Sequence, residues 1–301
     1  MIKISFEEYR QSASYSDLCG HRIAHWQSRV CGKSTETILL IHGFPSAAWD
    51  WHYQWINLAK AYQVITLDML GFGLSDKPKS HHYSLIEQAD IITALLKSKG
   101  IKTCHILAHD YGNSVAQELL SRHETGKLSF GISSLCFLNG GLFADYHRPL
   151  LSQKLLKGPL GFVFSRLMGK ASLKKSFTRI FATNTPPLDE DLDILWRLIS
   201  VNHGQRVLPG LLQYIDERHV HGERWLKDMQ STHVPLYFIN GVHDPISGQH
   251  MLDRYRETIP KPHTTALDVG HYPQLEAPEQ VLSLYKAFVH LYKSETYLLN
   301  E

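Results

Sequence analysis

The segment Ala108-His-Asp-Tyr-Gly112 decides the fold of this chain. A short apolar run, Cys104-His-Ile-Leu-Ala108, comes before it, and apolar residues at helical spacing, beginning with Val115 and Ala116, come after it. Small residues on both sides of such a turn let a strand and a helix approach closely, while the side chain between them is raised above the sheet. The pattern therefore predicts a strand, a sharp turn that presents Asp110, and a helix.

Short apolar runs bounded by turn residues recur along the chain and alternate with helical patterns. One helical pattern starts with a capping pair, Ser84 and Glu87, and ends at Gly100, and another starts near Pro278. The runs expected to form strands cover residues 37–41, 64–67, 104–108, 135–138, 234–239 and 264–268. This alternation is typical of an α/β fold with a mostly parallel sheet flanked by helices.

The alternation stops between about Gly141 and Leu226. Leucine and isoleucine recur there at helical spacing, with no strand-like run among them. We therefore expect one core domain formed by residues 1–141 and 227–301, with a helical cap, or lid, inserted over residues 142–226.

Composition and charge describe a globular protein that handles a small molecule. Hydrophobic residues make up 43% of the chain, and 31 Lys and Arg against 29 Asp and Glu leave a net charge of +2. Because the basic residues are scattered among acidic ones, this balance predicts neither nucleic acid nor a membrane as a partner. We see no signal peptide and no stretch near the ~20 apolar residues of a membrane span. We expect a cytoplasmic protein whose partner is a small apolar or neutral substrate.

Neither the cysteines nor the histidines form a recognisable ligand pattern. Cys19, Cys31, Cys104 and Cys136 include no C-x-x-C pair, and the last two lie in apolar runs, where a thiol behaves as a small hydrophobic group. The 19 histidines lack the spacing of zinc ligands, and Gly71-Phe-Gly73 lacks the third glycine of a dinucleotide site. We expect no disulfide, no metal and no cofactor.

Two further residues supply the partners that an acidic nucleophile at the turn needs. Asp244 follows the fifth expected strand and His271 follows the sixth. Each residue alone also has an ordinary explanation: Asp110 could cap the helix, Asp244 could belong to a turn before a proline, and His271 could be a surface histidine. Their order along the chain, with each residue placed after a strand, favours a catalytic triad of nucleophile, acid and histidine.

The loop after the first expected strand, His42-Gly-Phe-Pro45, predicts the donors for a developing oxyanion. The backbone N–H groups of Phe44 and Tyr111 are the candidates for this oxyanion hole. His42 is interpreted as a structural residue that hydrogen-bonds the loop. Phe44 and Trp49 could equally belong to the core, and Asn139 could orient a loop. The candidate pocket residues are Trp49, His109 and Asn139.

A carboxylate nucleophile narrows the chemistry. Aspartate, with an unperturbed pKa of about 3.9, is ionised at neutral pH without a base, so the histidine is free to activate water. A carboxylate is a weak nucleophile and attacks only carbon atoms with a strained or good leaving group, as in epoxides and alkyl halides. We expect Asp110 to form an alkyl ester that water, activated by His271 and Asp244, hydrolyses. An epoxide needs an acid for its ring oxygen, whereas a halide needs N–H donors.

Several segments of the chain match motifs of a known family. They are His42-Gly-Phe-Pro45, Leu67-Asp-Met-Leu-Gly-Phe-Gly73, Ser75-Asp-Lys-Pro78, His82-Tyr-Ser84, His109-Asp-Tyr-Gly112, Ala116-Gln-Glu-Leu-Leu120, His147-Arg-Pro-Leu150, Leu212-Gln-Tyr-Ile215 and His271-Tyr-Pro-Gln-Leu-Glu276. Over roughly residues 20–292 the sequence resembles the epoxide hydrolase and haloalkane dehalogenase branch of the α/β-hydrolase fold family, and most closely the mesoderm-specific transcript protein family.

The resemblance implies the α/β-hydrolase fold, the same triad, and lid tyrosines that activate the electrophile. One lid tyrosine is matched by Tyr214, although an aromatic residue on a helix could also serve packing alone. The only other tyrosine between residues 141 and 226 is Tyr146, which lies earlier than the family pattern suggests. Activation by two phenols therefore depends on where Tyr146 lies.

Two other functions stay open from the sequence. Haloalkane dehalogenases of this branch usually have tryptophan after the nucleophile and an asparagine or tryptophan donor elsewhere, where this chain has Tyr111 and Phe44. Fluoroacetate dehalogenases have arginine after the nucleophile, which this chain lacks, so anionic substrates are disfavoured. An epoxide hydrolase is the leading hypothesis and a haloalkane dehalogenase the second. The third is a weakly catalytic protein of the same fold that binds a ligand.

Overall fold

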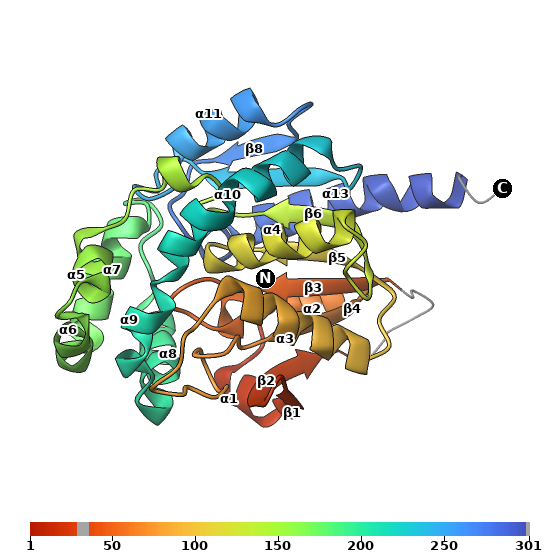
Figure 1. The fold of residues 1–301 in the computed structure, drawn as a ribbon. Helices are drawn as coiled ribbons and strands as arrows, with labels where there is room; N and C mark the ends of the chain where they lie inside the picture. The colour runs from red at the N-terminus through yellow and green to blue at the C-terminus, as the bar shows by residue number, and fades with distance from the viewer. Residues whose placement is uncertain (29–35, 299–301) are drawn as a thin grey trace.

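An eight-stranded sheet runs through the middle of the molecule (Figure 1). The structure, a computed structural model, describes residues 1–28 and 36–298, with side chains up to residue 292. The strand order is β1-β2-β4-β3-β5-β6-β7-β8, in which β1, β2 and β4 pair antiparallel and the remaining neighbours pair parallel. The strands are β1 (Ser14–Leu18), β2 (His21–Gln27), β3 (Thr37–Ile41), β4 (Gln63–Leu67), β5 (Thr103–Ala108), β6 (Gly131–Phe137), β7 (Leu236–Gly241) and β8 (Thr264–Leu267). The predicted fold class is confirmed.

All six apolar runs form strands, β3 to β8, but the antiparallel strands at the edge were not predicted. β1 and β2 form a hairpin whose turn residues Cys19 and Gly20 have φ of 52° and 83°. The outer strand of this hairpin, β1, has the largely polar sequence Ser-Tyr-Ser-Asp-Leu. Only one of its five residues is buried. A strand of this kind lacks the continuous apolar run by which buried parallel strands are recognised. Cys31, one of the four cysteines, lies outside the described residues.

Both faces of the sheet are buried. In β3, Leu39 and Ile41 belong to one apolar cluster, while Ile38 and Leu40 belong to the cluster on the other face. Helices α3 and α4 cover the first face, and α2 and α13 cover the second. The helices that accompany the sheet are α1 (Phe6–Gln11), η1 (Ala48–Trp51), α2 (Gln54–Ala59), α3 (Leu85–Ser98), α4 (Tyr111–Glu124), α11 (Gln249–Thr258), α12 (Pro273–Glu276) and α13 (Pro278–Leu298).

The chain between β6 and β7 contains helices and, in the part that the structure describes, no strand. They are η2 (Ala144–Tyr146), α5 (Leu151–Lys157), α6 (Gly161–Leu167), α7 (Lys170–Ile180), α8 (Asp189–Ser200), η3 (Val201–Arg206), α9 (Leu208–Leu211) and α10 (Tyr214–Ser231). Figure 1 shows α5 to α9 on one side of the sheet, with α10 running back across α4. Glu118 on α4 fixes α10 there by accepting hydrogen bonds from Arg224 and, at 2.9 Å, from Trp225 Nε1. The division into core and cap domains stays a prediction.

None of the described helices combines the length and the apolar character that crossing a membrane would require. This finding concerns residues 1–28 and 36–298 alone.

Gly112 lets α4 begin directly beside β3. A Cβ atom at this position would lie 2.5 Å from the backbone oxygen of Ile41 and 2.6 Å from that of His42. These are backbone atoms of the central strand and the loop after it, so they cannot move aside as the end of a flexible side chain can. The close approach brings the first turn of α4, with its free N–H groups, next to the loop that contains Phe44.

We expect Gly112→Ala to lower the free energy of unfolding by on the order of 2–4 kcal/mol, because the added methyl group must displace two backbone carbonyls. Gly222, within α10, is a matched control, since the nearest atom to a Cβ there would be the Ala144 side chain at 3.9 Å. Gly222→Ala should be neutral or stabilising by up to about 1 kcal/mol. Urea unfolding followed by circular dichroism measures both, and equal effects would contradict the close approach.

Candidate active site

Asp110 lies at the turn between β5 and α4 in a strained backbone conformation, with φ of 47° and ψ of −105°. A non-glycine residue in such a region costs about 1–3 kcal/mol and persists only where its surroundings enforce it. Here the N–H of Asp110 donates to the Asn139 carbonyl at 2.8 Å, and its own carbonyl accepts from Asn113 N–H at 3.1 Å. The turn that the sequence predicted is present, and it places the Asp110 side chain at the carboxyl edge of the sheet.

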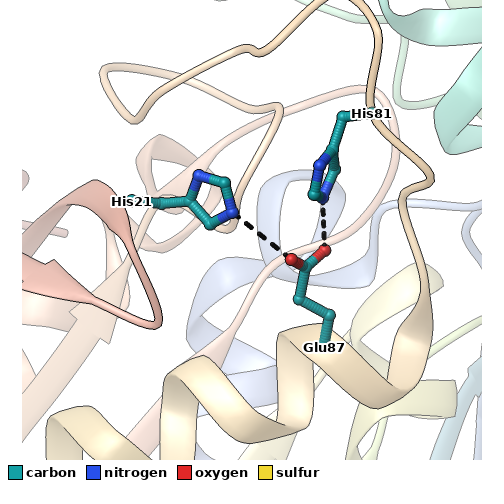
Figure 2. Close-up of side chains that lie close together, drawn as sticks. All are labelled: His21, His81 and Glu87. Atoms are coloured by element: carbon teal, nitrogen blue, oxygen red, sulfur yellow. Dashed lines mark hydrogen bonds and ion pairs between the residues drawn. The ribbon is translucent and has the colours of Figure 1, made fainter.

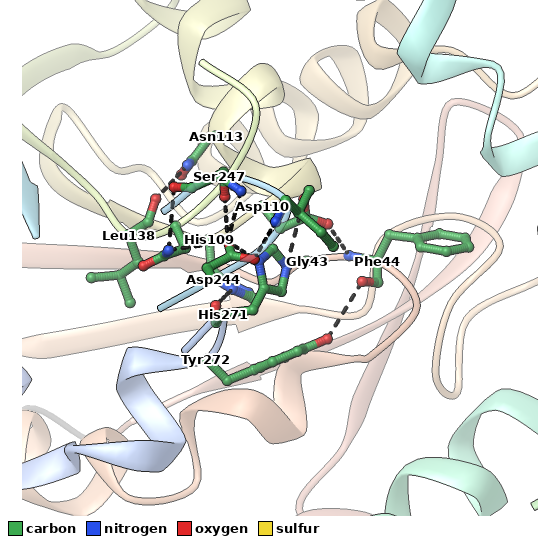
Figure 3. A network of polar contacts seen from close by, with 12 residues as sticks. Gly43, Phe44, His109, Asp110, Asn113, Leu138, Asp244, Ser247, His271 and Tyr272 are labelled. Carbon is green, nitrogen blue, oxygen red and sulfur yellow. Dashed lines mark hydrogen bonds and ion pairs between the residues drawn. The ribbon is translucent and has the colours of Figure 1, made fainter. Parts of the chain in front are cut away.

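The two carboxylate oxygens of Asp110 have different neighbours (Figure 3). Oδ2 accepts the backbone N–H of Phe44 at 3.0 Å, whereas Oδ1 lies 3.9 Å from His271 Nε2 and 4.0 Å from Arg218 Nη2. Burial alone would raise the pKa of Asp110, but the charges of His271 and Arg218 lower it. The carboxylate is therefore ionised at neutral pH although it is only 2% exposed.

Asp244 and His271 meet as the sequence predicted. His271 Nδ1 lies 2.6 Å from Asp244 Oδ2, and Asp244 also accepts the N–H of Ile246 at 2.8 Å and the hydroxyl of Ser247 at 2.6 Å. Burial opposes ionisation of Asp244, but His271 and these donors lower its pKa to about 2. Burial likewise opposes protonation of His271, but Asp244 and Asp110 raise its pKa to about 9. The structure thus brings Asp110, His271 and Asp244 together in the geometry of a triad.

The loop that carries His271 is hydrogen-bonded to the end of α7. The N–H of His271 donates to the carbonyl of Ile180 at 2.8 Å. Glu276 Oε2 accepts from the N–H of Gly270 at 2.8 Å and from the N–H of Ala182 at 2.9 Å. The position of the imidazole is thereby tied to one edge of the inserted helices.

Phe44 and Tyr111 lie where donors to an oxyanion would be needed. The N–H of Phe44 already contacts Asp110, and Tyr111 follows Asp110 as the first residue of α4, so its N–H belongs to the positive end of the helix dipole. His42 has the structural position expected of it: Nδ1 lies 2.8 Å from the carbonyl of Gly43, and Nε2 accepts the N–H of Met69 at 3.1 Å.

Tyr214, the first residue of α10, is fully buried beside the nucleophile. Its ring centroid lies 4.9 Å from that of Tyr111 and 6.3 Å from that of Phe44. Its hydroxyl has no hydrogen-bond partner among the described residues. Burial and the charge of Asp110 raise the pKa of Tyr214 well above its ordinary value. Tyr255 has a buried hydroxyl of the same kind elsewhere in the core, so it is the position of Tyr214 beside Asp110 and Arg218 that makes it a candidate proton donor.

Arg218 is a component of the site that the sequence analysis missed. It is 2% exposed, its Nε donates to Ser114 Oγ at 2.7 Å, and Nη2 donates to the Asp110 carbonyl at 3.1 Å. Its guanidinium carbon lies 4.4 Å from the centre of the Tyr214 ring. Arg218 follows Tyr214 by four residues, so both lie on one face of α10. Once Tyr214 is placed near the nucleophile, this spacing is the signal that would have revealed Arg218.

His109 and Asn139, expected to line a substrate pocket, lie instead beneath the catalytic residues. His109 Nε2 lies 2.8 Å from the carbonyl of His271, within hydrogen-bond distance. Asn139 Nδ2 donates to Asp244 Oδ2 at 3.1 Å and to the Gly241 carbonyl at 2.9 Å. Neither side chain lines a cavity in the structure, and their polar contacts support the Asp244 loop and the His271 loop.

Trp49 and Tyr146 also lie away from the cavity for which they were candidates. Trp49 is a core residue, with its ring stacked on His52 at 4.4 Å and edge-on to Tyr9 at 5.5 Å. Tyr146 in η2 is 38% exposed and lies under the guanidinium of Arg254 at 5.0 Å. The second phenol therefore does not accompany Tyr214, because the Tyr146 ring lies at the surface beside Arg254.

An apolar cavity of about 310 Å³ ends at the triad. Phe44 and His271 line it and are the lining residues next to the Asp110 carboxylate, whereas Asp110 and Tyr214 lie just behind them and are not part of its wall. Most of its wall comes from the inserted helices, including Leu155, Phe164, Leu167, Phe177 and Leu208. Such a wall suits an apolar or neutral ligand.

A separate cluster of possible metal ligands lies on α3 and the edge of the sheet (Figure 2). Glu87 joins two histidines: Oε2 is 2.7 Å from His81 Nε2 and Oε1 is 3.4 Å from His21 Nε2. All three ligand atoms lie within 4.8 Å of one another. The spacing rules applied to the sequence could not find this cluster, because the histidines are 60 residues apart and meet only through the pairing of β1 and β2 beside α3.

Comparisons with known proteins agree with this architecture. The model of the alpha/beta hydrolase fold family matches residues 36–278. The chain is 40% identical over 297 residues to the mesoderm-specific transcript homolog protein of Homo sapiens, covering 95% of this chain and 88% of the relative. It is 37% identical over 246 residues to the putative hydrolase LipZ of Mycobacterium tuberculosis, covering 81% of this chain and 85% of the relative.

Two solved structures share the fold at low sequence identity. A haloalkane dehalogenase DbeA loop variant from Bradyrhizobium elkanii has a TM-score of 0.78 at 17% identity, covering 95% of this chain and 99% of the other. The epoxide hydrolase CorEH has a TM-score of 0.75 at 20% identity, covering 92% and 97%. Taken with the family match and the two relatives, these findings show that the chain belongs to the α/β-hydrolase fold family and, within it, to the mesoderm-specific transcript protein family.

Proposed function

We propose that the chain is a hydrolase that opens epoxides through a covalent ester on Asp110. The observation that carries this proposal is the unequal environment of the two Asp110 oxygens. Oδ2 accepts the N–H of Phe44 at 3.0 Å, whereas Oδ1 faces His271 Nε2 at 3.9 Å without a hydrogen bond. One oxygen is held where an ester carbonyl oxygen belongs, and the other is free to attack.

In the first step, Asp110 Oδ1 attacks an epoxide carbon. A new C–O ester bond forms, the ring C–O bond breaks, and its electron pair moves to the ring oxygen. Tyr214 gives its proton to that oxygen, since its hydroxyl is protonated and unpaired beside the nucleophile. Arg218, whose guanidinium faces the Tyr214 ring, stabilises the phenolate that is left.

In the second step, formation of the ester changes the pKa of His271 in the direction that hydrolysis needs. Alkylation removes the negative charge of Asp110, which is one of the two carboxylates that raise the pKa of His271. The imidazole then loses its proton more easily and can accept one from water, while Asp244 keeps it oriented. Hydroxide adds to the ester carbonyl carbon, and the oxyanion forms at the oxygen that Phe44 N–H already holds, with Tyr111 N–H beside it.

Collapse of that intermediate closes the cycle. The ester C–O bond breaks, the leaving oxygen takes the proton from His271, and the diol is released. Asp110 then carries one oxygen from water. The proton of the new carboxylic acid passes through solvent to the Tyr214 phenolate, and the proton that His271 gave up to solvent after alkylation returns to the imidazole, which restores the resting state. One epoxide and one water give one diol, with no external oxidant or reductant.

The position of Tyr214 favours an epoxide over an alkyl halide. An epoxide oxygen needs a proton donor, and Tyr214 is an unpaired donor near Asp110. A halide needs N–H donors in its pocket, but Trp49 Nε1 belongs to the core on the far side of the Phe44 loop. Since α10 supplies Tyr214 and the other inserted helices supply most of the cavity wall, we also propose that residues 142–226 act as the lid over the substrate.

The nucleophile is tested by trapping the ester with an aryl epoxide such as styrene oxide. Asp110→Gly removes the carboxylate and tolerates positive φ, so it should fold and form no diol. His271→Gln should be alkylated without being hydrolysed, and its intact mass should rise by one epoxide molecule. The double variant Asp110→Gly/His271→Gln is the control, and its intact mass should not change. Mass added to the double variant, or no diol from the wild type together with no adduct in His271→Gln, would refute the proposal.

The acid is tested with a matched pair of tyrosines. Tyr214→Phe should lower kcat/KM for the epoxide by about 100-fold or more, because the ring oxygen then leaves without a proton. Tyr255 is the control, since it is equally buried, has a hydroxyl with no partner among the described residues, and packs against Phe238 away from Asp110. Tyr255→Phe should leave kcat/KM unchanged. An equal, small effect of both changes would assign electrophile activation to another group.

A further inference from the structure

Exposed apolar side chains gather on α5 and α6. Of the 14 large hydrophobic residues that are exposed in the described part of the chain, seven lie within residues 151–167. Figure 1 shows α5 and α6 on the outer side of the molecule, away from the sheet. We call these seven residues the α5–α6 patch: Leu151, Leu155, Leu160, Phe162, Val163, Phe164 and Leu167. Leu167 is 76% exposed and Phe162 is 54% exposed, so the patch is open to whatever lies outside.

Basic residues predominate around the patch. Residues 150–181 contain seven Lys and Arg and no Asp or Glu. Three of the lysines form ion pairs with acids of α8 and α10: Lys157 with Asp216, Lys170 with Asp193, and Lys174 with Asp189. The other four are exposed and have no ion pair within residues 1–28 and 36–298: Lys154, Arg166, Lys175 and Arg179.

The cavity that ends at His271 reaches the same surface. Leu155, Phe164 and Leu167 belong both to the patch and to the cavity wall. An apolar molecule on the patch would therefore meet a mostly apolar wall between these residues and His271. The patch and the cavity form one continuous apolar path.

We propose that the α5–α6 patch binds the surface of an anionic lipid bilayer and admits apolar substrate from it. Apolar side chains flanked by unpaired basic residues are the combination by which helices lie in a membrane interface, with the apolar groups below the headgroups and the charges among them. A second copy of the chain fits less well, because a two-fold contact would bring two surfaces of the same positive sign together. Binding of the α5–α6 patch to a bilayer does not depend on the proposed function, because the binding does not involve Asp110, Asp244 or His271.

Vesicle co-sedimentation tests the proposal with the full chain. The wild type should bind vesicles of phosphatidylcholine and phosphatidylserine, and binding should weaken as salt is added. The variant Leu151→Ser/Leu160→Ser/Phe162→Ser changes patch residues outside the cavity wall and should bind at least about tenfold more weakly. The variant Lys154→Gln/Arg166→Gln should lose about fivefold in affinity for each residue changed, and this loss should be confined to vesicles that contain the anionic lipid.

Controls of the same kinds lie elsewhere on the surface. Val220 on α10 is 74% exposed, and Lys127 is exposed and forms no ion pair with a described residue, so Val220→Ser and Lys127→Gln should bind as the wild type does. Absence of wild-type binding, or equal binding of the wild type and the patch variants, would overturn the proposal. So would a dimer in analytical ultracentrifugation that the patch substitutions dissociate, because a second copy would then be the occupant.

An independent observation, the cluster in Figure 2, carries a second inference. We infer that His21, His81 and Glu87 form a Zn²⁺ site. Two imidazole nitrogens and one carboxylate are a ligand set that zinc uses, with a fourth position left to water. His81 Nε2 and Glu87 Oε2, now 2.7 Å apart, need to separate by about 0.6 Å to reach the spacing of about 3.3 Å between two ligands of a tetrahedral zinc ion.

The backbone around these three side chains is held in place. The N–H of Arg22, next to His21, donates to Asp76 at 2.8 Å, and the N–H of Glu87 donates to the capping Ser84 hydroxyl at 3.1 Å. The three side chains are about one-fifth exposed, so an ion can enter and water can complete its coordination. The site therefore needs no rearrangement of strand or helix.

Calorimetric titration of chelator-treated protein with ZnCl₂ tests this site. One equivalent should bind, and His81→Ala or Glu87→Gln should weaken binding by about tenfold or more. His82 is the matched control, since it is the exposed neighbour of His81 and lies outside the cluster, so His82→Ala should bind as the wild type does. Mg²⁺ should not compete, because it prefers oxygen ligands. Failure to bind, or equal weakening by His82→Ala, would overturn the inference.

Discussion

The site depends on one constraint, the strained turn at Asp110. Its φ of 47° is possible only because the backbone on both sides is hydrogen-bonded and because Gly112 lets α4 come within contact of β3. Those two conditions place the carboxylate against the N–H of Phe44 at 3.0 Å. A relaxed turn would move the carboxylate away from both the oxyanion donors and His271, so the fold holds this strain where it serves the chemistry.

The charges around the Asp110 carboxylate give its neighbours different properties. His271 lies between two acids, and its pKa is raised to about 9 as long as both are charged. Arg218 adds a fixed positive charge on the other side of Asp110 and keeps the nucleophile ionised despite its burial. The same group cannot be both a resting cation and a base, and in the mechanism that we propose, alkylation of Asp110 would separate these two states of His271 in time.

The sequence predicted what depends on local pattern and missed what depends on contact between distant segments. The apolar runs, the turn at Asp110 and the order of Asp244 and His271 were all visible, because buried strands and the turns after them leave a continuous signal. Arg218 was missed because its role depends on α10 crossing α4. The positive charge of residues 150–181 was hidden in a net charge of only +2 because acids elsewhere in the chain balance it. The sequence of the β1–β2 hairpin does not repeat its apolar residues at the spacing of a strand or a helix, so the hairpin was missed. The cluster of His21, His81 and Glu87 was missed for a related reason, because it forms only where this hairpin meets α3.

The hydrogen bonds between the His271 loop and the end of α7 have a mechanical consequence. Because Ile180 and Ala182 are tied to His271 and Glu276, the inserted helices have one stationary border, and swinging α7 outward would unseat the imidazole. The start of the insertion is attached in the same way, because the N–H of Arg148, just before α5, donates to the carbonyl of Ile246 in the Asp244 loop at 3.2 Å. The inserted helices are thus anchored to both loops that hold the imidazole and its acid partner, so a displacement of these helices at either anchor would be transmitted to the His271–Asp244 pair.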